Sequence, residues 1–182
     1  MNILSITEGI DTNLYAKGKE LVERKVDILN FGRPNSNILL PAITKKWKCI
    51  YTIDKGKRVF TSSVFRSVLE DTRLTIALPR SMTQPEMAGD IETLTQRYWE
   101  NMLSRIVMVG HAPKELTDLI GYNPVIEIDM THSSEQFTDI LQHITDYQPL
   151  VDKNRETALR LSDWTMRMKE VMLWLKKLGY EV

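Results

Sequence analysis

The chain has 182 residues and a mass of 21.1 kDa, the size of one ordinary domain or of a large part of a two-domain protein. Hydrophobic residues make up 42% and charged residues 26% of it, which argues against a disordered or low-complexity chain. The 24 basic and 24 acidic residues give a formal net charge of zero, which argues against a nucleic-acid partner held by bulk electrostatic attraction.

Residues 1–25 are polar and mixed, with two glycines and a cluster of charged side chains, and are typical of a linker-like lead-in. Regular alternation of strands and helices begins after them. We predict a strand over 26–32, a helix over 36–48 and a strand over 49–53, because apolar runs alternate with segments of helical spacing. The basic segment 54–58 is predicted to be a loop.

The alternation continues through the middle of the chain. We predict a helix over 62–69 and a strand over 74–78, which Pro79 ends. After a loop, a helix is predicted over 94–103 and an apolar strand over 106–110.

The last third is predicted to contain a helix over 113–120, a strand over 125–128 and two closing helices over about 134–146 and 150–178. The last is long for a globular helix, so a break within it is expected. Strands that alternate with helices indicate parallel crossovers. We therefore predict an α/β fold: a Rossmann-like parallel sheet of about five strands, with helices on both faces and a long C-terminal helical segment.

The cysteine and hydropathy patterns narrow the class of protein further. Cys49 is the only cysteine, which excludes an internal disulfide and a cysteine-based zinc site. The N-terminal residues lack the basic and apolar segments of a signal peptide. The longest apolar stretch, 38–43, is far shorter than the roughly 20 residues of a membrane span. We expect a cytoplasmic protein that is not an integral membrane protein.

Three loops are candidates for ligand binding, because ligands of open parallel sheets bind beyond the carboxyl ends of the strands. They follow Gly32, Leu78 and Val109. Arg33 and Arg80 each come just after a predicted strand, where a guanidinium suits a phosphate group. The alternative is that both are solvated loop arginines, and spacing alone does not separate the two interpretations.

The segment from Glu92 to Glu100 is the most informative part of the sequence. At about 100° per residue, Glu100 lies opposite the apolar face of its helix, and Glu92 precedes the helix. Both carboxylates can accept hydrogen bonds from sugar hydroxyls, and the backbone N–H groups around Leu94 and Thr95 can hold a phosphate. Without further context a plainer explanation is favoured: Glu92 lies near a helix dipole and Glu100 on a solvated face.

Further context comes from a resemblance to the C-terminal half of retaining GT-B glycosyltransferases, in the family called glycosyl transferases group 1. Residues 9–15 resemble its interdomain "Gly-Val-Asp, three residues, Phe" segment, and residues 28–33 resemble its first strand and "Gly-Arg" loop. Residues 92–100 resemble its donor-binding motif, a glutamate, seven residues and a second glutamate. Residues 110–116 resemble its later strand–loop–helix ending in "Glu-Leu".

The resemblance implies that the chain binds a nucleotide-diphospho-sugar for retaining transfer, with 1–25 as the lead-in and 26–182 as the donor domain. Glu92 would contact the donor sugar and act in catalysis, and Glu100 would bind the nucleotide's ribose. The N–H groups near Leu94 and Thr95 would meet the pyrophosphate, assisted by Arg33. Arg80 stays a second candidate for the phosphate. No cofactor or metal is expected, because arginine and helix-end N–H groups can neutralise the diphosphate.

The sequence also departs from the family. The lysine that usually follows the "Gly-Arg" arginine is missing, and Arg105 stands where the family's "Glu-Ala-Met-Ala-x-Gly" has its glycine. The region from Leu78 to Thr95 is more similar to spore-coat-type glycosyltransferase-like proteins. The acceptor-binding N-terminal domain that the resemblance implies is absent from the chain, so a partner domain or subunit is expected to supply it.

Two other interpretations remain open. The first is a noncatalytic, degenerate donor domain kept as a binding or regulatory module, which the missing lysine and Arg105 favour. The second is an unrelated doubly wound protein such as a flavodoxin-like receiver domain. Such a domain needs an acidic cluster at its strand ends, and Asp54 has no acidic neighbour in sequence. The apolar row Trp164, Met168 and Met172 is predicted to pack in the core, or to face a partner domain where it is exposed.

Overall fold

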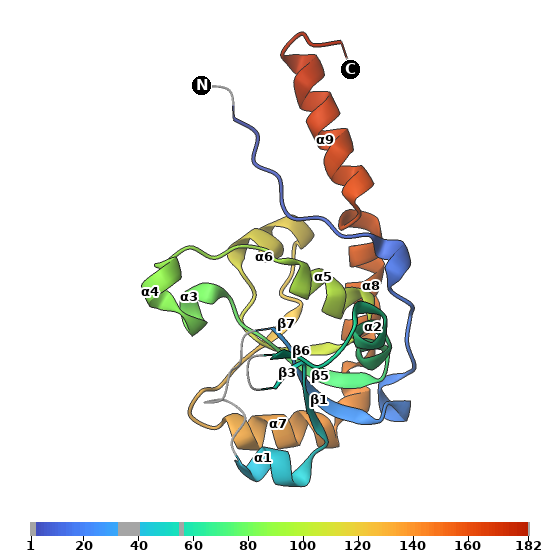
Figure 1. The fold of residues 1–182 in the computed structure, drawn as a ribbon, viewed down its shortest axis with the longest axis vertical. Coiled ribbons are helices and arrows are strands. Elements are labelled where there is room, and N and C mark those ends of the chain that lie inside the picture. The colour runs from blue at the N-terminus through green and yellow to red at the C-terminus, as the bar shows by residue number, and fades with distance from the viewer. Residues whose placement is uncertain (1–2, 33–40, 55–56, 182) are drawn as a thin grey trace.

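The computed structural model describes residues 3–32, 41–54 and 57–181 (Figure 1). Its centre is a parallel sheet of five strands, in which all neighbouring pairs run in the same direction, in the order β2-β1-β5-β6-β7. The strands are β1 (Val26–Asn30), β2 (Cys49–Tyr51), β5 (Thr72–Ala77), β6 (Val107–Gly110) and β7 (Val125–Glu127). The predicted α/β fold is confirmed.

Helices cover both faces of this sheet. Figure 1 shows α1 and α7 on one side and α2, α5 and α6 on the other, with α8 running from the level of α7 to that of α5. Their bounds are α1 (Pro41–Lys46), α2 (Ser62–Glu70), α5 (Gln96–Leu103), α6 (Lys114–Ile120), α7 (Ser133–Gln142) and α8 (Gln148–Leu161). Part of the helix predicted over 36–48 lies outside the described residues. The arrangement leaves the carboxyl ends of the strands as one edge on which side chains from several elements meet.

The central strand β5 supplies both hydrophobic layers. Leu74 and Ile76 join the cluster that packs against α7 at Phe137. Ala77 belongs to the opposite cluster, with Trp99 of α5. Successive side chains of a strand point to opposite faces, so one strand buried on both sides reads as a nearly continuous apolar run. This is why the strand was predictable from sequence.

The structure adds short elements that periodicity did not indicate. The loop before residue 92 contains two short helices, α3 (Arg80–Thr83) and α4 (Pro85–Ala88). The predicted basic loop is part of an antiparallel hairpin of β3 (Ile53–Asp54) and β4 (Lys57–Arg58). Three-ten turns of three or four residues also appear at η1 (Thr12–Leu14), η2 (Leu21–Glu23) and η3 (Ile144–Tyr147). Such pieces are too short to show a period.

The predicted long C-terminal helix is interrupted, as expected. After α8 the chain is extended at Asp163, whose carboxylate accepts the N–H of Thr165 at 2.8 Å and begins a new helix, α9 (Trp164–Lys177). An aspartate in this position satisfies an N–H that the first helical turn leaves unpaired. The break therefore has a local cause in the sequence.

The lead-in packs against the domain rather than standing free. The N–H of Ile10 donates to the carbonyl of Ser162 at 2.8 Å, and Leu21 is completely buried. The buried guanidinium of Arg24 donates to the carbonyls of Thr72 and Ser104, at 2.6 and 2.9 Å. Burial lowers the pKa of Arg24 to about 10. These contacts fix the path of the first 25 residues across the helices.

Helix α9 extends away from the sheet beside the N-terminal segment (Figure 1). Trp164, Met168 and Met172 are 43%, 54% and 39% exposed, so the prediction that this row packs in the core is wrong. The reason is that α9 continues beyond the layers that its apolar face would need for burial. None of the described helices is long and apolar enough to cross a bilayer.

Candidate functional site

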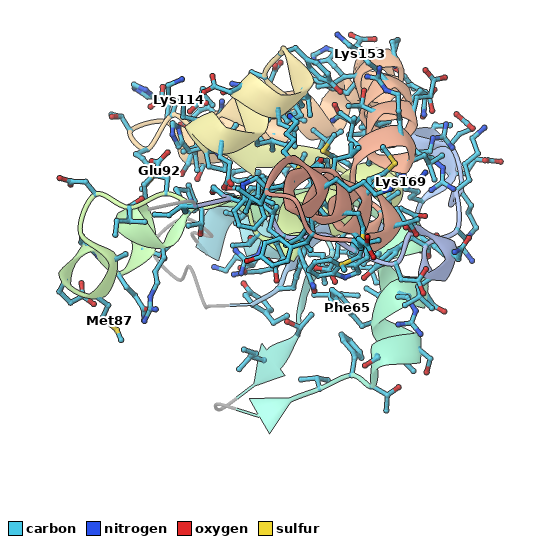
Figure 2. All side chains as sticks on the ribbon, turned by 90° about the horizontal axis from the view of Figure 1, so that it is seen from above. Phe65, Met87, Glu92, Lys114, Lys153 and Lys169 are labelled. Atoms are coloured by element: carbon cyan, nitrogen blue, oxygen red, sulfur yellow. The ribbon has the colours of Figure 1, made fainter. Side chains whose placement is uncertain are left out.

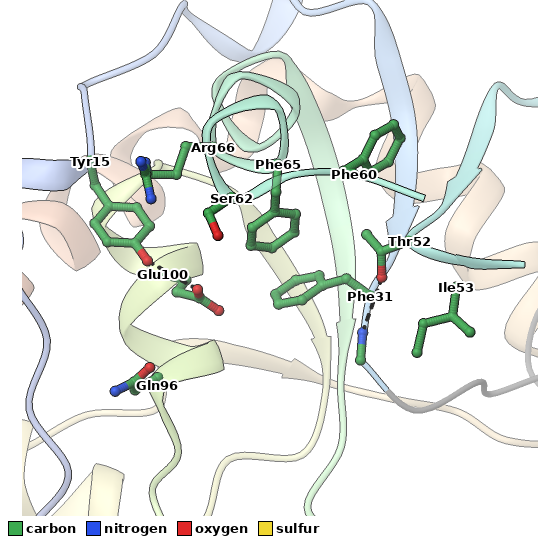
Figure 3. A pocket seen from close by; sticks show the side chains of 11 residues that line it. Tyr15, Phe31, Thr52, Ile53, Phe60, Ser62, Phe65, Arg66, Gln96 and Glu100 are labelled. Carbon is green, nitrogen blue, oxygen red and sulfur yellow. Dashed lines mark hydrogen bonds between the residues drawn. The ribbon is translucent and has the colours of Figure 1, made fainter. Parts of the chain in front are cut away.

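A cavity of about 420 Å³ lies at the carboxyl end of β1 (Figure 3). Four parts of the chain supply its walls: the lead-in, the end of β1, the segment from β2 to α2, and α5. The lining residues are Tyr15, Phe31, Gly32, Thr52, Ile53, Phe60, Ser62, Phe65, Arg66, Gln96 and Glu100. Its position is the edge at which parallel sheets bind ligands.

One part of the cavity is aromatic. The rings of Phe31 and Phe65 lie with their centroids 5.1 Å apart at an angle of 58°, and Phe60 and Ile53 lie beside them in Figure 3. Aromatic walls of this kind bind planar, partly apolar groups. Sequence reasoning missed these residues, because they come from a strand end and a helix that are far apart in the chain.

The other part is polar and is dominated by Glu100. Its Oε1 accepts the hydroxyl of Tyr15 at 3.0 Å. Burial raises the pKa of Glu100, while the Tyr15 hydrogen bond and the positive charge of Arg97 act in the opposite direction. Arg66 and Gln96 line the same part of the cavity. A half-buried carboxylate beside cations is suited to accept hydrogen bonds from hydroxyl groups.

Glu92 lies in the loop before α5 and is not among the residues that line this cavity. Figure 2 shows it well apart from Phe65. Its Oε1 is 3.4 Å from Nε2 of His111, and Nδ1 of His111 is 3.0 Å from Oε2 of Glu127. Burial alone lowers the pKa of His111, but the two carboxylates outweigh it and raise the pKa. The structure therefore brings Glu92 to a histidine after β6.

The start of α5 already holds two carboxylates of the protein. The N–H of Leu94 donates to Oε2 of Glu115 at 2.7 Å, and the N–H of Gln96 donates to Oε2 of Glu8 at 2.9 Å. Within the described part of the chain, the N–H of Thr95 has no protein acceptor. Negative groups are favoured at this helix end. Of the two backbone N–H groups predicted to hold a phosphate, that of Leu94 is bonded to Glu115 and that of Thr95 is available to a ligand.

The candidate arginines have different surroundings. Arg33 lies outside the described residues. Arg80 is exposed on α3, where it donates to Oε1 of Gln84 at 3.3 Å and contacts the sulfur of Met87 at 3.1 Å. Figure 2 shows Met87, on the neighbouring helix α4, far from Phe65 of the cavity. Arg80 therefore belongs to a part of the surface distinct from the cavity.

Arg97 is a cation near the cavity that sequence reasoning did not select. Its guanidinium carbon lies 5.3 Å from the centre of the Phe31 ring. A Cβ atom on Gly32 would come within 1.9 Å of Nη2 of Arg97, and Gly32 has a φ of +82°. The positive φ favours glycine at this position, and any other residue would also displace the guanidinium of Arg97. The "Gly-Arg" glycine therefore makes room for a cation from α5.

Across the residues that the structure describes, no group of three or more His, Cys, Asp or Glu side chains is arranged to hold a metal ion. No model of a known protein family matches the sequence, and no curated protein does. Solved structures do match. One is the crystal structure of AviGT4, a glycosyltransferase involved in avilamycin A biosynthesis, with a TM-score of 0.63 and 14% identity. The match covers 97% of this chain.

This chain shares its fold with part of a glycosyltransferase. It spans 58% of the length of AviGT4. At 14% identity the likeness concerns the fold alone.

Proposed function

We propose that the chain is the donor-binding domain of a GT-B glycosyltransferase of the group 1 type and binds a nucleotide-diphospho-sugar. The observation that carries the proposal is the cavity at the end of β1, which joins a half-buried carboxylate, Glu100, to an aromatic wall. The likeness of the fold to AviGT4 supports it. A nucleoside needs both features, because its base is planar and its ribose carries hydroxyl donors.

In this proposal the base lies against Phe31 and Phe65, and the ribose hydroxyls donate to Glu100. The ring pair and the carboxylate line one cavity of about 420 Å³, which falls within the usual range for small-ligand sites. Glu100 must be ionised to accept both hydroxyls. Since burial raises its pKa, binding weakens as the pH falls through that raised value.

The diphosphate then extends toward the start of α5. Thr95 offers its N–H there, and Arg33 comes three residues after the end of β1 in the sequence. The phosphate role goes to these two residues rather than to Leu94, whose N–H is bonded to Glu115, or to Arg80, which is exposed on α3. Glu8 must share this helix end with the diphosphate or leave it.

For the transfer step we propose that Glu92 contacts hydroxyls of the donor sugar and that the configuration of the sugar is retained. Arg33, the Thr95 N–H and the dipole of α5 stabilise the negative charge on the departing diphosphate. This scheme requires no metal. The sugar would extend past the start of α5 toward His111, which already pairs with Glu92.

The acceptor site is assigned to a second Rossmann-like domain or partner subunit, because the chain spans 58% of the length of AviGT4. The exposed apolar row on α9 supplies a surface for such a contact. Transfer by this polypeptide alone is not part of the proposal. Donor binding is the activity that the described residues can carry.

Calorimetric titration with the diphosphates of uridine, thymidine, guanosine, adenosine and cytidine tests the proposal. We expect one or more of them to bind, and Glu100→Gln to weaken that binding by roughly tenfold or more, because charge-assisted hydrogen bonds are lost. Glu86→Gln, which changes an exposed carboxylate on α4, is the matched control. Glu92→Gln is expected to weaken binding of the matching nucleotide-sugar but not of the diphosphate.

The alternative is a noncatalytic binding or regulatory module that has lost its donor. The carboxylates of Glu8 and Glu115 at the start of α5 favour it, because they occupy N–H groups that a phosphate would use. It predicts that none of the five nucleoside diphosphates binds, even at millimolar concentration. That result would replace the donor-binding proposal with the alternative.

A further inference from the structure

A hydrogen bond links the lead-in to the candidate site. Tyr15, just after η1, places its hydroxyl 3.0 Å from Oε1 of Glu100, a residue 85 positions later in the chain. Figure 3 shows the two side chains meeting at the polar part of the cavity. Both line the cavity wall, so the contact belongs to the site rather than to a distant part of the core.

The backbone at Tyr15 and Ala16 is hydrogen-bonded to α8. Arg155 of α8 donates to the carbonyls of Tyr15 and Ala16, at 3.4 and 3.1 Å, and also to the carbonyl of Leu103 at the end of α5. The Tyr15 ring packs against two of the buried clusters. The guanidinium of Arg155 therefore links the lead-in, which carries Tyr15, to α5, which carries Glu100.

The protonation states of the pair define which residue donates the hydrogen bond. Burial and the negative charge of Glu100 raise the pKa of Tyr15, so its phenol stays protonated and acts as the donor. Glu100 is then the acceptor, and its ionised form gains the bond. Besides the Tyr15 hydrogen bond, two charges act on Glu100. Arg97 on α5 favours ionisation of the carboxylate, and Glu8 in the lead-in opposes it. Arg66 of α2 faces Tyr15.

We propose that Tyr15 is a positioning residue for Glu100: its hydroxyl holds the carboxylate in one orientation at the cavity wall and favours its ionised, hydrogen-bond-accepting form. The role in binding rests on the proposed function, in which Glu100 accepts the ribose hydroxyls of the donor. The effect on Glu100 itself does not need a ligand. Without Tyr15, the half-buried carboxylate would be free to rotate and would take up a proton at a higher pH.

The test is Tyr15→Phe, which removes one oxygen atom and keeps the ring. In the ligand-free protein, we expect carboxyl-carbon NMR to show the Glu100 pKa rising by about one unit. For the nucleoside diphosphate that binds, affinity is expected to fall by about three- to tenfold at neutral pH and more steeply below it. Tyr180→Phe, an exposed tyrosine beyond α9, is the control and leaves both quantities unchanged.

Two further measurements keep the proposal falsifiable if Tyr15→Phe folds poorly. In Glu100→Gln, absorbance titration should show the Tyr15 pKa falling toward its ordinary value, because the neighbouring charge is gone. Adding Tyr15→Phe to Glu100→Gln should cause no further loss of affinity, because the two residues act through one bond.

An unchanged Glu100 pKa in Tyr15→Phe, or an unchanged Tyr15 pKa in Glu100→Gln, would overturn the positioning role. The proposed function fails by a different result, which is a wild-type protein that binds no nucleoside diphosphate. The two failures are therefore distinguishable in the same set of proteins.

Discussion

Arg105 occupies a backbone conformation that ordinarily belongs to glycine. Its φ is +56°, directly after α5, and its side chain is buried. Nε lies 2.5 Å from Oδ1 of Asp152, and Nη2 lies 2.8 Å from Oε2 of Glu20. Position 105 is where the resemblance places the glycine of the family motif. In this chain the position combines a left-handed backbone with ion pairs that hold the lead-in and α8 against it.

The positive φ of Arg105 predicts that glycine at this position gives a more stable variant than alanine, the reverse of the usual order. Both Arg105→Ala and Arg105→Gly lose the two ion pairs, but glycine relieves the strain of the left-handed backbone, which is about 1 kcal/mol. The glycine variant should therefore be the more stable of the two in urea denaturation. An alanine variant as stable as the glycine variant would show that the positive φ costs nothing.

His111, after β6, forms pH-dependent ion pairs with Glu92 and Glu127. Its folded-state pKa is raised, so its bonds to Glu92 and Glu127 stabilise the fold below the ordinary histidine pKa of about 6.5. This contribution disappears as the pH rises through the raised value. His111→Gln should lower the free energy of unfolding by at most about 1 kcal/mol near pH 5.5, because the pair is partly solvated, and by nothing near pH 9.

The control for this prediction is His143→Gln, which alters an exposed histidine at the end of α7. Urea denaturation at both pH values provides the measurement. A loss of stability in His111→Gln that is the same at acidic and alkaline pH would mean that packing, and not the charge of the imidazole, is what the substitution removes.

The sequence predicted part of the candidate site at the scale of single residues. Glu100 was selected through the resemblance to the family motif, and it lines the cavity, while its role in binding stays a prediction. Tyr15 was part of a quoted motif, but nothing in the sequence indicated its hydroxyl bond to Glu100, which joins positions 85 residues apart. Phe31 and Phe65 were missed for the same reason. Local periodicity carries no information on which distant side chains share a cavity.

At the scale of elements, the short helix α5 connects the parts of the candidate site. Glu8 bonds to its first residue, and Tyr15 bonds to Glu100 one turn later. Both partners come from the lead-in. Movement of residues 8–15 would therefore change the start of α5 and the carboxylate of the cavity together.

Glu8 is expected to compete with the diphosphate of the donor at this helix end. Glu8→Gln keeps the size of the side chain and removes its charge, so a nucleoside diphosphate should bind severalfold more tightly, by roughly 1 kcal/mol. The corresponding nucleoside without phosphates is the control ligand, and its affinity should not change. Equal gains for both ligands would contradict competition for the phosphate position.

Helix α9 should tolerate charge where a core helix does not. Met168→Lys and Met172→Lys change exposed side chains, so together they should shift the thermal midpoint by no more than about 2 °C. Met102→Lys, at a completely buried position on α5, should prevent folding. A large loss of stability in the α9 variants would show that this row packs in the core after all.

The fold was predictable where the hydrophobic pattern was long enough to repeat. All five parallel strands were predicted, because each is an apolar run bounded by loops and helices. The hairpin β3–β4 and the helices α3 and α4 were missed, since two to four residues show no period. The exposure of α9 was expected only as the alternative to core packing, because an apolar row does not specify what covers it.

At the scale of the whole molecule, the sheet order brings the functional candidates to one edge but not into one cavity. Glu100 lies beyond β1 with the aromatic rings, and Glu92 lies beyond β6 with His111. Helix α5 separates the two places, with the available N–H of Thr95 at its start. A donor that spans them must be extended, with its nucleoside, diphosphate and sugar at three successive points.

Amide NMR of the ¹⁵N-labelled protein, titrated with the nucleoside diphosphates, tests the central claim most directly. We predict that one of them shifts the resonances around the cavity, at Gly32, Thr52, Ser62, Gln96 and Glu100, and leaves those of α3 and α4 unchanged. Resonances that do not move with any of these ligands, or shifts confined to Arg80–Ala88, would contradict donor binding at the end of β1.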